Sequence, residues 1–274
     1  YGKLLLQAQW LSNPGWADSW MDYASLKRLV GVIAEETGGP EASKGKKPNK
    51  SETMGPPLFD PKRSVTPKRI SNMLCERAFF IELKKNLDRV CSFYDEQEKV
   101  LVTRAKQLSQ SVDAAEKMAP ERIAKKRPLP LSHLVDSLKV LYVDLMMLEN
   151  YAVMNYGGFA KILKKHDKNT PFTTQEKYLR KVVNPQAFAL YFSLKECIKL
   201  VESCFEKVIA LNEQMNGPIK TINNPRSRLN TEDRVRLEHL ASLGAASSTE
   251  HQALTHQNEP SPAANVVENT SAEP

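Results

Sequence analysis

Four lysines follow one another at helical spacing near the middle of the chain: Lys161, Lys164, Lys165 and Lys168. In a helix that turns about 100° per residue, their side chains fall within an arc of about 100°. The apolar residues between them point to the other side of that helix: Phe159, Ile162 and Leu163. Ammonium groups gathered on one face of a helix suit a multiply phosphorylated anion, because each is a compact positive charge with several donors.

This lysine stripe has an energetic cost and an ordinary alternative explanation. Four like-charge pairs stand three or four residues apart, which costs about 1–2 kcal/mol in total without a counter-ion. Cations are favourable at a helix C-terminus, and this accounts for Lys165 and Lys168. It accounts poorly for Lys161, about two turns upstream. A solvated face and an anion site both remain open from these residues alone.

Two further features point to a neighbour beside the stripe. Gly157 and Gly158 each cost about 1 kcal/mol relative to Ala inside a helix, and they let another element approach closely, either as a packing notch or to complete a site. The first two predicted helices are the candidate neighbours. Tyr23 and Lys27, four residues apart, offer a hydroxyl and a charge that suit phosphate, although Tyr23 also fits a core or rim aromatic.

Long helices are needed to position these groups. Apolar spacing predicts helices over 2–12, 17–35, 71–118, 131–168, 173–183 and 184–216. The two longest are joined by a basic connection and form an antiparallel pair. The fold class is therefore all-α: an N-terminal helical hairpin packed on a bundle, forming one domain over 1–216. Composition predicts a disordered basic linker over 38–68 and a disordered tail or linker over 217–274, within which residues 230–243 could form a transient helix.

Charge limits the class of partner. The formal charge is +7, and residues 237–274 hold five Glu without Lys, Arg or Asp, so residues 1–236 carry 39 − 27 = +12. A basic body suggests a polyanion: nucleic acid, a membrane surface or a phosphorylated small molecule. The stripe lacks the interleaved aromatics and Arg forks of nucleic-acid sites, which disfavours the first. No run is long enough to span a membrane, and no secretory signal is evident.

Catalytic and metal-binding patterns are missing from the sequence. It contains no Ser/His/Asp set, carboxylate dyad, phosphate-cradling glycine loop or zinc spacing, so we predict neither an enzyme nor a cofactor. His166 falls on the apolar side of its helix and is expected in the core. The cysteines are expected to be buried free thiols: Cys75, Cys91, Cys197 and Cys204.

Four segments, in order, resemble the motifs of the SPX domain family. They are YGKLLL at 1–6, WADSWMDYASLK at 16–27, the segment 80–94, and 148–168 with its lysine stripe. The resemblance spans about residues 1–215, and Gly157 departs from it where Thr is commoner. It implies a helical module, with an N-terminal hairpin set against two long helices, that binds inositol pyrophosphates and related polyphosphates at a basic surface.

The resemblance also implies roles for individual residues. Direct phosphoryl contacts would come from Tyr23, Lys27 and Lys164 or Lys165. The other of that lysine pair, with Lys161 and Lys168, would complete the cluster, and Lys3 would help close the site.

The implied function is phosphate-status sensing, read by a protein partner such as a transcription factor or a fused transporter or enzyme domain, in the nucleus or facing the cytoplasm. One alternative is the regulatory front piece of a phosphate transporter or polyphosphate-metabolising protein. Another, from a different class, is a helical scaffold that binds nucleic acid or membranes.

Overall fold

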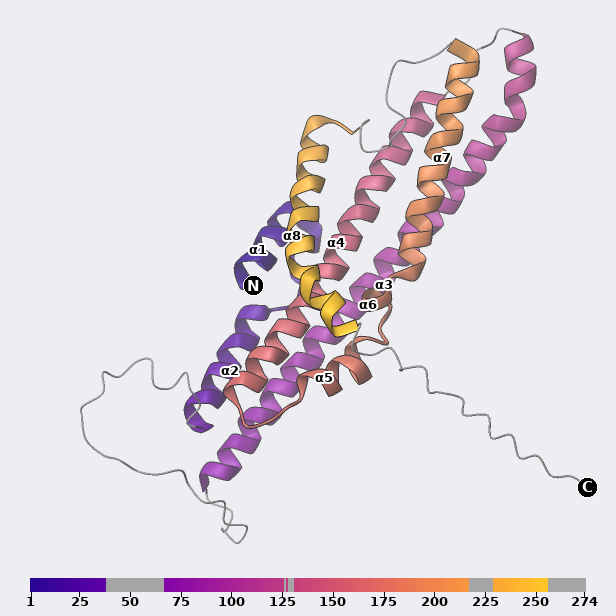
Figure 1. The fold of residues 1–274 in the computed structure, drawn as a ribbon. Helices are drawn as coiled ribbons and strands as arrows, with labels where there is room; N and C mark the ends of the chain where they lie inside the picture. Colours follow the sequence, from indigo (N-terminus) through magenta and orange to yellow (C-terminus); the bar gives the residue numbers. More distant parts are fainter. Residues whose placement is uncertain (38–66, 126, 128–130, 217–228, 256–274) are drawn as a thin grey trace, which may run out of the picture.

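The computed structural model describes residues 1–37, 67–125, 127, 131–216 and 229–255. Helices make up the regular structure of this part of the chain (Figure 1). In chain order they are α1 (Gly2–Leu11), the 3₁₀ helix η1 (Pro14–Ser19), α2 (Tyr23–Thr37), α3 (Pro67–Ala124), α4 (Leu131–Asn169), α5 (Gln175–Tyr178), the π-helix η3 (Leu179–Val183), α6 (Ala187–Leu190), α7 (Phe192–Asn216) and α8 (Thr231–Thr255).

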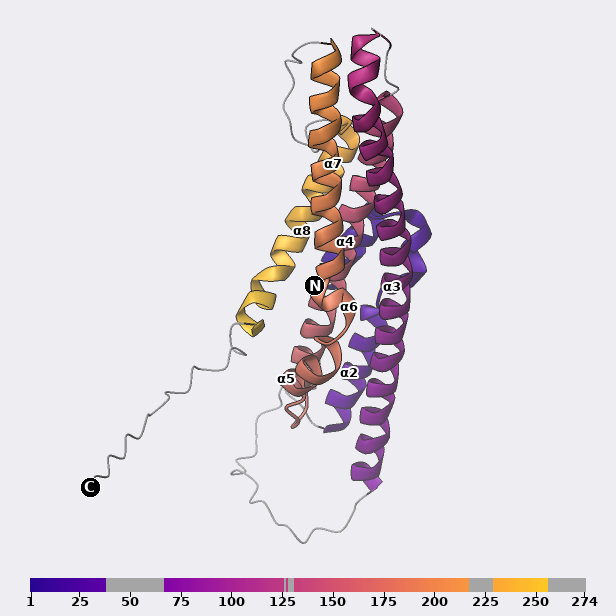
Figure 2. The same cartoon turned by 90° about the vertical axis from the view of Figure 1, so that its right-hand side faces the viewer.

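Helix α4 lies at the centre of the bundle. It runs antiparallel to α3 and packs against α1, α2, α7 and α8, as the two perpendicular views show (Figures 1 and 2). Its apolar residues at steps of three and four are fully buried, among them Leu138, Leu141, Leu145, Leu148 and Ala152. The predicted all-α fold, with an N-terminal hairpin on two long antiparallel helices, is confirmed. None of the described helices is both long enough and apolar enough to cross a membrane.

Several boundaries differ from those predicted. Helix α2 begins at Tyr23 rather than Ala17, because the residues before it form η1 and then an extended stretch held by side chains of α3 and α4. Helix α3 continues through Pro120, beyond the predicted end at Met118. The helix predicted over 184–216 is broken at Tyr191, whose φ of 35° lies in the left-handed region. Most of the predicted linker, 38–66, lies outside the described residues.

The tail prediction fails for α8. Residues 217–274 were expected to be a disordered tail or linker with no more than a transient helix over 230–243, yet Thr231–Thr255 form a helix that packs on α4 and α1. The reason is a single seam of leucines, Leu237, Leu240 and Leu243, which become buried against α4. Residues 217–228 and 256–274 lie outside the described part of the chain. The four cysteines carry free thiols as expected; Cys197 and Cys204 are buried, and Cys75 and Cys91 are partly buried.

Candidate anion-binding site

The lysine stripe occupies the last two turns of α4. Lys164 and Lys168 are exposed, and Lys161 and Lys165 are partly buried. The opposite side of the same turns is packed in the core, where Phe159, Ile162 and Leu163 have no appreciable exposure. One side of α4 is therefore fixed by packing while the other presents ammonium groups, as the spacing predicted.

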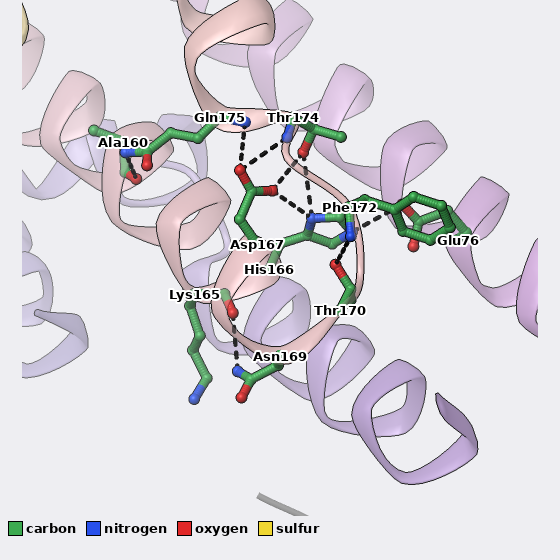
Figure 3. Close-up of polar contacts among 10 residues, drawn as sticks. All are labelled: Glu76, Ala160, Lys165, His166, Asp167, Asn169, Thr170, Phe172, Thr174 and Gln175. Carbon is green, nitrogen blue, oxygen red and sulfur yellow. Dashed lines mark hydrogen bonds and ion pairs between the residues drawn. The ribbon is translucent and has the colours of Figure 1, made fainter. Parts of the chain in front are cut away.

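His166 anchors this end of α4 to α3. Its ring is fully buried and stacks on the Phe79 ring, with centroids 4.8 Å apart. The Nε2 atom lies 2.9 Å from Oε1 of Glu76, and Nδ1 lies 3.0 Å from Oδ1 of Asp167 (Figure 3). His166 is thus a core residue, as expected, and both ring nitrogens are occupied within the protein.

Asp167 anchors the same turn to α5. Its Oδ2 accepts hydrogen bonds from the backbone N–H groups of Thr174 and Gln175, each at 2.8 Å. Burial alone raises the pKa of this carboxyl, but the hydrogen bonds from Gln175, His166 and Thr174 outweigh burial and lower it. The ionised carboxylate therefore caps α5. Lys165 points away from this network (Figure 3).

A second set of polar contacts fixes the start of α2. The hydroxyl of Tyr151 donates to the carbonyl of Ser19 at 2.8 Å, and Oδ1 of Asn155 accepts from the N–H of Met21 at 3.0 Å. From α3, Oδ1 of Asn86 accepts from the N–H of Asp22 at 2.6 Å. Buried side chains of both long helices thus satisfy the extended residues that lead into α2.

Asp22 itself caps α2. Its Oδ1 accepts from the N–H of Ser25 at 2.9 Å, as an N-cap carboxylate does. Burial raises its pKa, but hydrogen bonds from Ser25 and the charges of Arg28 and Arg89 outweigh burial and lower it. The orientation of α2, and with it the direction of Tyr23 and Lys27, is set by these contacts.

A groove of about 660 Å³ opens between α1 and the start of α2. Its lining includes Lys3 from α1, Tyr23 and Lys27 from α2, and Arg89 from α3. Two carboxylates, Asp18 and Asp22, also line it, and the second is engaged in capping α2. The structure therefore brings three of the predicted site residues together, two of them cations, and adds Arg89 as a third cation.

The glycine pair joins this groove to the stripe. A Cβ atom at Gly158 would overlap Sδ of Met21, and one at Gly157 would overlap Oγ of Ser247. By helical geometry the two glycines share the α4 face that carries Lys161 and Lys165. The stripe is thus the continuation of the surface on which the N-terminal segments pack. The expected notch is present, although none of the described residues that line the groove is a stripe lysine.

Comparison with known proteins finds similarity to SPX domain proteins. A family model described as SPX domain matches residues 124–182, which contain the glycine pair and the stripe. SPX domain-containing protein 2 of Arabidopsis thaliana is 28% identical over 209 residues, covering 75% of this chain and 66% of that protein. The protein of the same name from Oryza sativa subsp. indica is 29% identical over 207 residues, covering 74% and 66%. The chain thus spans slightly less than two thirds of these relatives.

A solved SPX domain structure is also similar to this chain. It is the SPX domain of Chaetomium thermophilum glycerophosphodiester phosphodiesterase 1 in complex with inositol hexakisphosphate (InsP6). It has a TM-score of 0.53 and 26% identity, and the match covers 76% of this chain and 98% of that one. In sequence and in fold, the chain is similar to the SPX domain family.

Within this SPX fold, sequence reasoning missed the residues that position the site. Asn86, Tyr151 and Asn155 hold the approach to α2, and Arg89 lines the groove. The sequence did offer one signal for Asn86 and Asn155. Both asparagines lie on the apolar faces of predicted long helices, and a buried amide there requires a hydrogen-bond partner. Their partners lie 64 and 134 residues away, a separation that helical spacing cannot reveal. Among the described residues, no cluster of His, Cys, Asp or Glu could hold a metal ion.

Proposed function

We propose that this SPX domain binds an inositol polyphosphate or pyrophosphate at the junction of α2 and α4. Tyr23, Lys27 and Lys164 or Lys165 contact phosphoryl groups directly; Lys161, Lys168 and the other of the pair surround them, and Lys3 closes the site from α1. The bound state reports phosphate status to a protein partner, such as a transcription factor or a fused transporter or enzyme domain. The domain needs no cofactor and performs no catalysis.

The observation that carries this proposal is the seating of α2 beside the lysine face of α4. Met21 packs on Gly158, one turn before Lys161, and two residues later Tyr23 and Lys27 begin α2 in a groove that also holds Lys3. This packing supports a shared site for the cations of α2 and the lysine stripe of α4. Several phosphates on a rigid ring suit such a surface, because charge-assisted hydrogen bonds are stronger than neutral ones.

The solved SPX domain that this chain resembles holds InsP6, which supports the same ligand class here. The front-piece alternative, in which the domain regulates a fused transporter or polyphosphate-metabolising protein, uses the same site and differs only in the partner. For intracellular sensing the domain would act in the nucleus or face the cytoplasm.

The test is a calorimetric titration of the full chain with InsP6, beside a 20-base-pair DNA duplex and anionic liposomes. We expect micromolar binding of InsP6, weakened at least about tenfold by Lys164→Ala combined with Lys165→Ala, since a hydrogen bond to a charged group contributes about 1.5–3 kcal/mol. Binding of InsP6 that survives this double change unaltered would refute the site. Tight binding of the duplex alone would favour the scaffold alternative.

A matched control is available on α7. Lys195 and Lys199 line a hollow with Glu149, which lies about 18 Å along α4 from Lys161. Lys195→Ala combined with Lys199→Ala removes the same charge, so it reports the effect of net charge alone. We expect this variant to bind InsP6 as the wild type does.

A further inference from the structure

Helix α1 forms one wall of the groove but has little intrinsic stability as a helix. It has only ten residues, Gly2–Leu11, fewer than the ~12–15 at which an isolated helix becomes even marginally stable in water. It has no acidic residue in its first turn, no basic residue in its last turn and no side-chain cap at Tyr1. The position of Lys3 therefore depends on what α1 packs against, which is α4, η1 and α8.

Helix α8 supplies the cation that the C-terminal end of α1 lacks. The guanidinium of Arg236 donates through Nε to the carbonyl of Leu11 and through Nη2 to the carbonyl of Ser12, the latter at 2.6 Å. The last carbonyls of a helix have no partner within that helix, and a positive charge beside them is favoured by the helix dipole. One side chain of α8 thus caps α1.

Helix α8 also reaches the other end of α1. Oγ of Ser247 lies 3.2 Å from the hydroxyl of Tyr1, which donates to the carbonyl of Met154 on α4. The Tyr1 ring lies 5.6 Å, centroid to centroid, from the ring of Tyr23, one of the proposed ligand contacts. Ser247 fits because Gly157 has no side chain. The N-terminal end of α1 is therefore held between α8, α4 and α2.

No described residue of α8 lines the groove. Its own seat is on α4, where Leu237, Leu240 and Leu243 are buried and Nδ2 of Asn150 donates to the carbonyl of Leu240 at 2.6 Å. In Figures 1 and 2, α8 runs beside α4 and next to α1. Helix α8 can therefore act on a ligand in the groove only through the helices on which it packs, α4 and α1, and the contacts of Arg236 are with the end of α1.

We infer that α8 is a positioning element of the anion site: it holds α1 at both ends, so that Arg236, remote from any phosphoryl group, sets the affinity for the ligand. The inference rests on the proposed function. Because coupling between two sites is reciprocal, a ligand that fixes α1 also stabilises the docking of α8. The site is thus linked to the C-terminal part of the chain, where a partner that captures α8 would weaken ligand binding.

The test uses the full chain and compares Arg236→Ala with Arg234→Ala, an exposed arginine on the same helix. Two quantities are measured: the affinity for InsP6 by calorimetry, and amide hydrogen exchange in α1 and in residues 231–247, with and without InsP6. For Arg236→Ala we expect faster exchange throughout α1 in the free protein and about tenfold weaker binding of InsP6. Arg234→Ala should match the wild type in both.

Hydrogen exchange in the wild type tests the inference even if the Arg236→Ala variant fails to fold. We expect InsP6 to slow exchange in residues 231–247, although no described α8 residue lines the groove. Equal affinity of the two arginine variants, or exchange in α8 that InsP6 leaves unchanged, would overturn the inference while the proposed function stands. If the wild type does not bind InsP6 at all, the proposed function fails and this inference fails with it.

Discussion

The side-chain carbonyl of Asn155 accepts a hydrogen bond from the backbone N–H of Met21, at 3.0 Å, and its amide donates to the carbonyl of Tyr151 at 2.8 Å. Asn155 is fully buried, so both contacts form away from water. Met21 is the last buried residue before α2 and packs on Gly158. One amide of α4 therefore fixes where α2 begins relative to the helix that bears the lysine stripe.

Replacing Asn155 tests whether ligand binding depends on the contact that positions the start of α2. Asn155→Leu retains the volume but leaves the N–H of Met21 buried without an acceptor, which we expect to lower the free energy of unfolding by about 1–3 kcal/mol. The start of α2 should also loosen, so InsP6 should bind more weakly even to the folded fraction. Urea unfolding and calorimetry measure the two effects. Gln110→Ala, at an exposed position in α3, is the control.

The close approach at Gly158 predicts opposite effects for two glycine substitutions. Gly158→Ala places a Cβ where Sδ of Met21 lies, so we expect a loss of about 1–3 kcal/mol of stability through overpacking. Gly31→Ala, inside α2, meets nothing within 4 Å, and its better helix propensity should stabilise the protein by up to about 1 kcal/mol. Thermal or urea unfolding of the two variants decides the sign. Equal and favourable changes would mean that Met21 does not pack on α4 as described.

Asp167 should make stability fall in acid. Its pKa lies below the ordinary 3.8 because hydrogen bonds from Gln175, His166 and Thr174 outweigh the effect of burial. A lowered native pKa contributes stability that is complete above the unfolded value and is lost as the pH falls through the native value. We therefore expect the stability of the wild type to fall below about pH 5 in part through this group.

The matched variants are Asp167→Asn and Asp136→Asn. The first removes the charge that caps α5 and should flatten this part of the pH profile while lowering stability near neutral pH. The second removes an exposed carboxylate of the same helix. Urea unfolding from pH 7 down to about pH 3 measures both profiles. A profile for Asp167→Asn that parallels the wild type would show that the cap does not depend on charge.

The sequence indicated the long helices and the lysine face correctly because both follow from spacing along a single helix. For α8 it indicated no more than a transient helix over 230–243, since a seam as short as Leu237, Leu240 and Leu243 gives little periodic signal beside the Ala and Ser around it. The break at Tyr191 was equally hidden, because a left-handed non-glycine residue is imposed by tertiary packing. Arg236 was not foreseen either, because its acceptors lie 225 and 224 residues away.

The glycine pair combines a feature that the sequence predicts with one that only the structure reveals. Two adjacent glycines inside a helix predicted the close approach of another element. The structure identifies what approaches: Met21 at Gly158, and Ser247 with Tyr1 at Gly157. A cost in helix propensity can be read locally, but its cause lies in elements distant along the chain. The same holds for the proposed site, whose α4 half is evident from spacing and whose α2 half required the resemblance or the structure.

The central claim is that one phosphorylated ligand is held by α2 and α4 together. The most direct measurement is the affinity of the full chain for InsP6 in Lys27→Ala, in Lys165→Ala and in Lys99→Ala, an exposed cation on α3 that does not line the groove. We predict that Lys27→Ala and Lys165→Ala each weaken binding by about tenfold or more, while Lys99→Ala stays close to the wild type. Unchanged affinity in Lys27→Ala, with or without an effect of Lys165→Ala, would contradict the claim.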